Sequence, residues 1–97
     1  MTYEEQCAID LLAYYKASTF TMWTDQPMHL INHIAREQAR FATNFALQRV
    51  IDNCIDLADD EDLNLTDVLN NHAGYQHYCD ILDAIDTIPL GDNDTRR

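Results

Sequence analysis

Apolar and polar residues alternate with a helical period at the start of the chain. Thr2 and Glu5 form a capping-box signature, in which each side chain bonds to the backbone of the other residue. Apolar residues then recur three and four positions apart as far as Tyr15. The spacing predicts a first helix over about residues 3–17.

The next segment, residues 18–23, reads Ser-Thr-Phe-Thr-Met-Trp and has no polar face. Because β-branched and aromatic residues favour extended backbone, we interpret it as an extended connection, with a short strand as the alternative. This connection should place Phe20 and Trp23 in the core.

A second amphipathic run begins after Thr24 and Asp25. Either residue can cap a helix, and Pro27 is tolerated in a first turn. The run predicts a helix that continues to about residue 38. Its buried stripe would consist of Leu30, Ile31 and Ile34.

Apolar spacing resumes after residue 38 and continues to Ala58. No Gly or Pro separates the two runs, so the sequence allows either a bend near residues 38–43 or one long helix. The expected apolar face consists of Phe41, Phe45, Leu47, Val50, Ile51, Cys54, Ile55 and Ala58.

The acidic run Asp59–Asp62 should end this helix. Neighbouring carboxylates repel one another, and they oppose the negative end of the helix dipole. Thr66 then offers an N-cap for a short helix that Gly74 would close. A last helix is predicted over about residues 75–87.

Helix breakers are scarce, with two Gly and two Pro in 97 residues. This scarcity argues against the many turns of a β-sandwich or barrel. We therefore predict an all-α fold, a compact bundle of four to five helices with a short extended segment near 18–23. A single acidic helical domain should cover residues 1–91, and Pro89 and Gly91 should stop the last helix before a flexible tail over 92–97.

Size and composition set further expectations. A chain this short buries only about 60–65% of its unfolded surface, so a homodimer would add buried area. No window approaches the roughly 18 apolar residues of a membrane span, and the N-terminus is acidic rather than signal-like. Three widely spaced cysteines do not fit a disulfide framework. We expect a cytoplasmic protein with free thiols and no membrane partner.

The charge of the chain is distributed unevenly. Residues 1–49 carry five acidic and four basic residues, whereas residues 50–97 carry twelve acidic and two basic residues. The net charge is thus −1 in the first half and −10 in the second. A surface of one sign repels nucleic acid and anionic membranes and attracts basic proteins. Direct nucleic-acid binding is therefore not expected.

The acidic residues of the second half fall on helix faces. On a helical wheel those of residues 52–60 lie within about 100° of one another, opposite the apolar positions, and the last predicted helix repeats this division. Any amphipathic helix needs a solvated face, but such faces usually interleave both signs. No basic residue occurs between Arg49 and Arg96. The predicted partner-binding residues are Asp52, Asp56, Asp59, Asp60, Glu61, Asp62, Asp67, Asp80, Asp83 and Asp86.

Residues 64–82 contain an acidic Leu-x-Asp helix start, an Ala one helix later, and His-Tyr followed by Asp-Ile. These features lie at Leu65, Asp67, Ala73, His77, Tyr78, Asp80 and Ile81. At these positions the segment resembles part of the Ocr-like antirestriction proteins of phages. The resemblance covers about a fifth of the chain and needs a gap near Gly74.

This resemblance implies an acidic helical dimer that imitates the shape and charge of DNA and blocks restriction enzymes. Within the matched stretch, binding through surface acids carries over only to Asp67 and Asp80. The nearly neutral first half departs from the family and argues against full-length duplex mimicry. Small phage inhibitors of CRISPR complexes (anti-CRISPR proteins) are similar in size and acidity. The expected partner is thus a basic nucleic-acid-binding defence protein in the cytoplasm of a bacterial host.

Candidate catalytic and metal-binding residues are few. His29, His33 and Glu37 are spaced four residues apart, which could place two imidazoles and a carboxylate on one metal, but the set lacks the His-Glu-x-x-His pattern. Acidic neighbours of Cys79 disfavour a reactive thiolate beside His77. No phosphate-binding loop or nucleophile motif occurs. We expect neither enzymatic activity nor a cofactor or bound metal.

A second class of function uses the other half of the chain. In this alternative the protein is a small helical adaptor or regulatory subunit, and its acidic residues serve solubility alone. The partner-binding surface would then be apolar. It would consist of Tyr15, Phe20, Met22 and Trp23.

Overall fold

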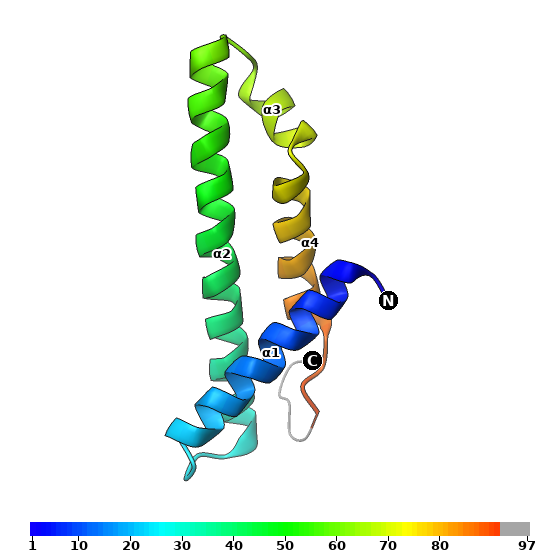
Figure 1. The fold of residues 1–97 in the computed structure, drawn as a ribbon. Coiled ribbons are helices and arrows are strands. Elements are labelled where there is room, and N and C mark those ends of the chain that lie inside the picture. Colours follow the sequence, from blue (N-terminus) through cyan, green and yellow to red (C-terminus); the bar gives the residue numbers. More distant parts are fainter. Residues whose placement is uncertain (92–97) are drawn as a thin grey trace.

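The computed structural model describes residues 1–91 and confirms the all-α prediction (Figure 1). These residues form four helices and no strand. The helices are α1 (Tyr3–Met22), α2 (Met28–Glu61), α3 (Leu65–Asn71) and α4 (Ala73–Thr87). The predicted tail, 92–97, lies outside the described residues.

The long helix α2 sets the shape of the molecule, whose principal extents are 54 × 26 × 20 Å. After α2 the chain turns back, so that α3 and α4 run antiparallel beside it (Figure 1). Helix α1 crosses both α2 and α4 near one end of the molecule (Figure 1). One end is therefore a three-helix bundle, and the other is a narrower hairpin of α2 with α3.

The core lies where the three long helices meet. Ala8 of α1, Ala39 of α2 and Ala84 of α4 are all buried there. Small side chains let helix backbones approach closely, and larger ones fill the remaining space. The larger buried side chains of this cluster are Leu12, Ile81 and Ile85.

The prediction of an extended connection over residues 18–23 is wrong, because α1 continues to Met22. Thr21 donates a hydrogen bond from its hydroxyl to the carbonyl of Ala17 at 3.0 Å, which keeps a β-branched residue within the helix. Phe20 and Trp23 do not enter the core, since their exposed fractions are 48% and 47%.

Helix α2 runs without a break through residues 38–43, so the long-helix alternative is correct. Thr43 supports this stretch, because its hydroxyl donates to the carbonyl of Ala39 at 2.9 Å. The predicted caps Thr24 and Asp25 are wrong. Helix α2 begins after Pro27, whose carbonyl accepts the first backbone hydrogen bonds.

Two further caps differ from the prediction. Asn64, rather than Thr66, caps α3, and its side chain accepts from the Thr66 amide at 2.9 Å. Gly74 does not end α3 but lies in the first turn of α4. The side chain of His72 caps α4 by accepting from the Gly74 amide at 3.0 Å. A Cβ at Gly74 would lie 3.0 Å from the His72 ring, which favours glycine there.

Candidate protein-binding surface

The acidic residues at the end of α2 lie on its solvent side. Asp52, Asp56, Asp59 and Asp60 are exposed, whereas Cys54 and Ala58 are buried on the opposite side. The structure therefore places these four carboxylates on the surface and away from the core. Glu61 and Asp62 complete the row, and Asp62 ends α2 in the left-handed conformation with a φ of 53°.

This row has a high linear charge density. Six acidic residues lie between Asp52 and Asp62, which corresponds to about 15 Å of helix axis. That is one charge per about 2.5–3 Å, close to the one phosphate per about 3.4 Å of a single DNA strand. The mean charge density of the row is therefore comparable with that of one DNA strand, and four of the six charges lie in the consecutive residues Asp59–Asp62.

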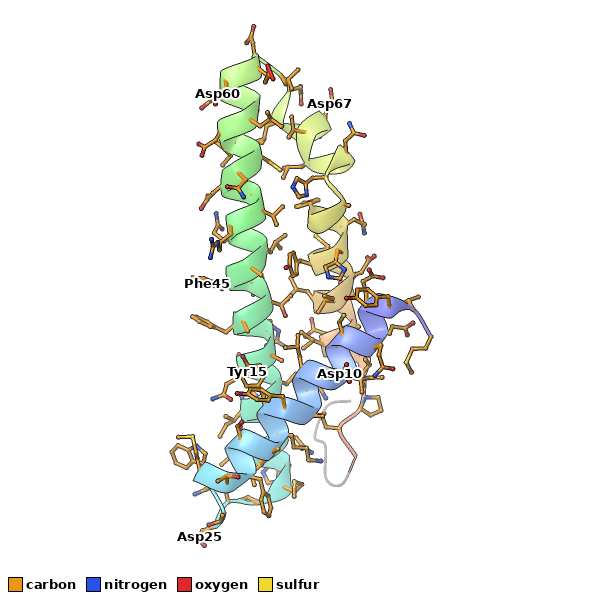
Figure 2. All side chains as sticks on the ribbon, in the orientation of Figure 1. Asp10, Tyr15, Asp25, Phe45, Asp60 and Asp67 are labelled. Carbon is orange, nitrogen blue, oxygen red and sulfur yellow. The ribbon has the colours of Figure 1, made fainter. Side chains whose placement is uncertain are left out.

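No basic side chain neutralises the row within residues 1–91. None of its six acidic residues takes part in an ion pair there. Asp52 accepts a hydrogen bond from Gln48 Nε2 at 3.0 Å, and Gln48 carries no charge. Asp67, exposed in the first turn of α3, adds a carboxylate near the same end of the molecule (Figure 2). This end is therefore strongly negative.

A second acidic group forms between α1 and α4. Asp80 and Asp83 line a shallow hollow together with Glu4 and Glu5 at the start of α1. Sequence analysis assigned Glu4 and Glu5 to the nearly neutral half and missed them as site residues. No local signal could have found them, because only the packing of α1 on α4 brings the four carboxylates together.

Two of these carboxylates are held in place by hydrogen bonds. Glu4 Oε2 lies 2.9 Å from His77 Nδ1, and this hydrogen bond holds the pKa of Glu4 below its ordinary value. The capping box with Thr2 likewise lowers the pKa of Glu5. The ring of Tyr3 stacks on His77 with centroids 5.6 Å apart. Glu4 and Glu5 therefore stay ionised to a lower pH than an ordinary glutamate does.

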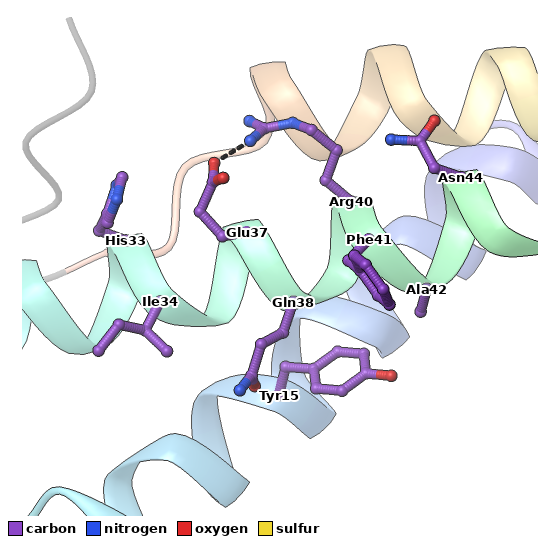
Figure 3. A pocket seen from close by; sticks show the side chains of 9 residues that line it. All are labelled: Tyr15, His33, Ile34, Glu37, Gln38, Arg40, Phe41, Ala42 and Asn44. Atoms are coloured by element: carbon purple, nitrogen blue, oxygen red, sulfur yellow. Dashed lines mark hydrogen bonds and ion pairs between the residues drawn. The ribbon is translucent and has the colours of Figure 1, made fainter.

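Asp86 forms an ion pair with Arg40 of α2. Its carboxylate accepts from Arg40 Nη2 at 2.6 Å and from Arg40 Nε at 3.2 Å, and the hydrogen bonds raise the pKa of Arg40. Arg40 also pairs with Glu37 (Figure 3), so its one positive charge offsets the charge of Asp86 only in part. Asp86 therefore contributes less to an acidic surface than Asp80 or Asp83.

The two acidic groups lie at different heights on the molecule. Gly74 lies level with Val50, since a Cβ there would be 3.5 Å from Val50 Cγ2. As α4 runs antiparallel to α2, Asp80 lies further from the acidic end of α2 than Gly74 does. The acidic residues of α2 and those of α4 therefore do not form one continuous acidic face.

The outer surface of α2 also carries two exposed phenyl rings. The prediction that Phe41 and Phe45 belong to the buried apolar face of this helix is wrong, because their exposed fractions are 74% and 63%. Phe41 lines an open groove with Tyr15, Ile34 and Gln38 (Figure 3). Phe45 points away from α4 (Figure 2).

The histidine set of α2 does not form a metal centre in the structure. Among residues 1–91, no group of three or more His, Cys, Asp or Glu side chains is arranged to hold a metal ion. Glu37 instead pairs with Arg40, and His33 lies at the edge of the groove. All three cysteines, Cys7, Cys54 and Cys79, are free thiols.

Comparison with known proteins gives no relatives. No protein-family model, curated protein or solved structure matches the chain. The resemblance to phage antirestriction proteins thus stays a prediction from residues 64–82. None of the helices within residues 1–91 combines the length and apolar character that a membrane span requires.

Proposed function

We propose that this protein is a phage-type inhibitor that binds a nucleic-acid-binding defence protein of its host, a CRISPR complex or a restriction enzyme. The contact surface is the acidic row Asp52–Asp62, extended by Asp67. The observation that carries this proposal is the charge of the row, which no ion pair offsets within residues 1–91 and whose mean linear density is close to that of a DNA strand.

The mechanism is competition for a basic groove. Carboxylates of the row occupy the Lys and Arg side chains that would otherwise hold phosphates, and they exclude DNA while they remain bound. Helix α2 presents the row on a rigid rod, so little conformational freedom is lost on binding. The second group, Glu4, Glu5, Asp80 and Asp83, provides a further negative area for a partner that extends beyond the row.

A competition assay tests the proposal directly. Fluorescent duplex DNA is bound to a purified guide-loaded CRISPR complex or restriction enzyme, and the protein is added as competitor at low and high salt. We expect displacement of DNA at low salt and weaker displacement at high salt, because screening shortens the reach of the charges.

Two charge variants identify the surface. Asp52→Asn with Asp56→Asn should raise the inhibitory concentration about tenfold, equivalent to about 1.4 kcal/mol. The control Asp10→Asn with Asp25→Asn removes the same charge from the nearly neutral half and should change it less than about twofold. Equal effects of the two pairs, or displacement that ignores salt, would refute a specific acidic surface.

A second candidate function, the helical adaptor, is favoured by a different observation. Phe20, Met22 and Trp23 are each exposed near the end of α1. Exposed apolar and aromatic side chains of this kind are typical of protein interfaces. Phe20→Ala with Trp23→Ala should then abolish partner binding while the acidic variants leave it intact, provided circular dichroism shows an unchanged fold.

A further inference from the structure

The distribution of aromatic residues is unusual for a monomer. All three phenylalanines and the single tryptophan of residues 1–91 are exposed, whereas five of the ten buried hydrophobic residues are alanines. Aromatic side chains normally supply much of the apolar area that a core buries. The fold therefore leaves its largest apolar side chains for a surface.

The most exposed of these rings share one face. Phe41 and Phe45 are four residues apart, so they lie on the same side of α2. Beside them, Tyr15 lines the groove with Phe41, and Tyr14 packs edge-to-face on Tyr15 with centroids 5.1 Å apart. We call Tyr14, Tyr15, Phe41 and Phe45 the aromatic face.

The exposed rings of this face supply about half of the area that one side of a standard dimer interface buries. An aromatic side chain buries about 150–250 Å², so the exposed parts of Tyr14, Phe41 and Phe45 amount to roughly 300–500 Å². A standard interface buries about 800 Å² per partner. The neighbouring polar side chains Gln38 and Gln48 can supply a rim for the rest.

The aromatic face is also much less acidic than the row Asp52–Asp62 on the same helix. Glu37, at one edge, is paired with Arg40. Between Glu37 and Asp52 the only other charged residue is Arg49, which is exposed. A basic partner would be drawn to the row Asp52–Asp62 instead. A second copy of this chain can approach here without placing carboxylates against carboxylates.

Charge also selects the orientation of the second copy. A parallel pair of α2 helices would bring two acidic rows together. An antiparallel pair centred between Phe41 and Phe45 separates the rows and places Phe41 beside Phe45 of the second copy. In that register Arg49 lies at the level of Glu37 of the second copy, because both are six residues from the centre.

We propose that the aromatic face is an antiparallel homodimer interface, in which α2 packs on α2 of a second copy. In this register the two α2 helices overlap over residues 28–58, so Asp59–Asp62 of each copy lie beyond the overlap, one group at each end of the dimer. This association does not depend on the proposed inhibitory function. Salt should strengthen the association of the two copies, whereas it should weaken the binding of a basic partner. Apolar contact between two chains of net charge −11 strengthens as salt screens their repulsion.

Sedimentation equilibrium of the full chain tests the proposal. At 0.5 M salt we expect a mass of twice the 11.2 kDa chain at micromolar concentrations, and weaker association at 0.05 M. Phe41→Ala with Phe45→Ala should raise the dissociation constant at least about thirtyfold. The control Phe20→Ala, which removes an exposed ring outside this face, should leave it unchanged. A monomer at all concentrations, or a dimer that survives the double variant, overturns the proposal.

A distance measurement tests the orientation. A spin label at Asp60→Cys, in a chain whose three native cysteines are replaced by Ala, lies 17 residues from the dimer centre. The antiparallel register predicts about 50 Å between the two labels, from a rise of about 1.5 Å per residue. A separation under about 20 Å would overturn this register. Loss of DNA displacement with the dimer intact would instead contradict only the inhibitory function.

Discussion

Arg36 of α2 donates hydrogen bonds from Nη1 to the carbonyl oxygens of Ile85 and Ile88 at the end of α4. The guanidinium is buried, with only 4% of the residue exposed. The last carbonyls of a helix lack partners within the helix and carry its negative dipole end. One buried cation thus satisfies the end of α4 and fixes it to α2.

Loss of this contact should be costly. Arg36→Met leaves buried carbonyls without their donor, and we expect the free energy of unfolding to fall by about 2–4 kcal/mol. Arg49→Met removes the same charge from an exposed position and should change it by less than about 0.5 kcal/mol. Urea unfolding followed by circular dichroism measures both. Similar losses in the two variants would show that the hydrogen bonds of Arg36 add little.

The alanine core predicts that added volume is harmful. Ala39 is fully buried where α2 meets α1 and α4, so Ala39→Leu should force the helices apart and cost about 1–3 kcal/mol. The control Ala13→Leu adds the same volume at an exposed position of α1. Thermal unfolding should separate the two variants, and an unchanged midpoint for Ala39→Leu would contradict the close packing.

The start of α1 predicts a dependence on pH. The folded-state pKa of Glu4 is lowered by its hydrogen bond to His77. A lowered pKa stabilises the fold above the ordinary glutamate pKa of about 4.3, and this contribution is lost as the pH falls through the folded value. The stability difference between the native chain and Glu4→Gln should therefore be present at pH 7 and shrink below about pH 4. A difference that grows on acidification would contradict this assignment.

The sequence predicts the fold class because its evidence is local. Few breakers, the capping box of Thr2 and Glu5 and the helical periodicity are all visible without tertiary structure. Tertiary packing decides the rest. Phe41 and Phe45 have the spacing of a core stripe, yet Ala39 and Thr43 take the core side because small residues allow close helix approach.

Some features of the candidate surface can likewise be predicted from the sequence, and others depend on tertiary packing. Exposure of Asp52 and Asp56 follows from the helical wheel, since their apolar counterparts lie on the opposite side. The pairing of Asp86 with Arg40 and the approach of Glu4 to Asp80 join residues more than forty positions apart. No spacing rule within one helix can predict such pairs.

The acidic residues at the end of α2 should lower the stability of the fold while they support partner binding. Asp60 and Glu61 lie in the last turn of α2, where negative charge opposes the helix dipole. Asp60→Asn with Glu61→Gln should therefore raise the free energy of unfolding by about 0.3–1 kcal/mol per residue at low salt. If the row binds a basic groove, the same variant should displace less DNA in the competition assay. If the variant is more stable and still inhibits fully, these two carboxylates are dispensable for binding. If it is more stable but inhibits less, the chain retains an unfavourable charge cluster because its partner requires it.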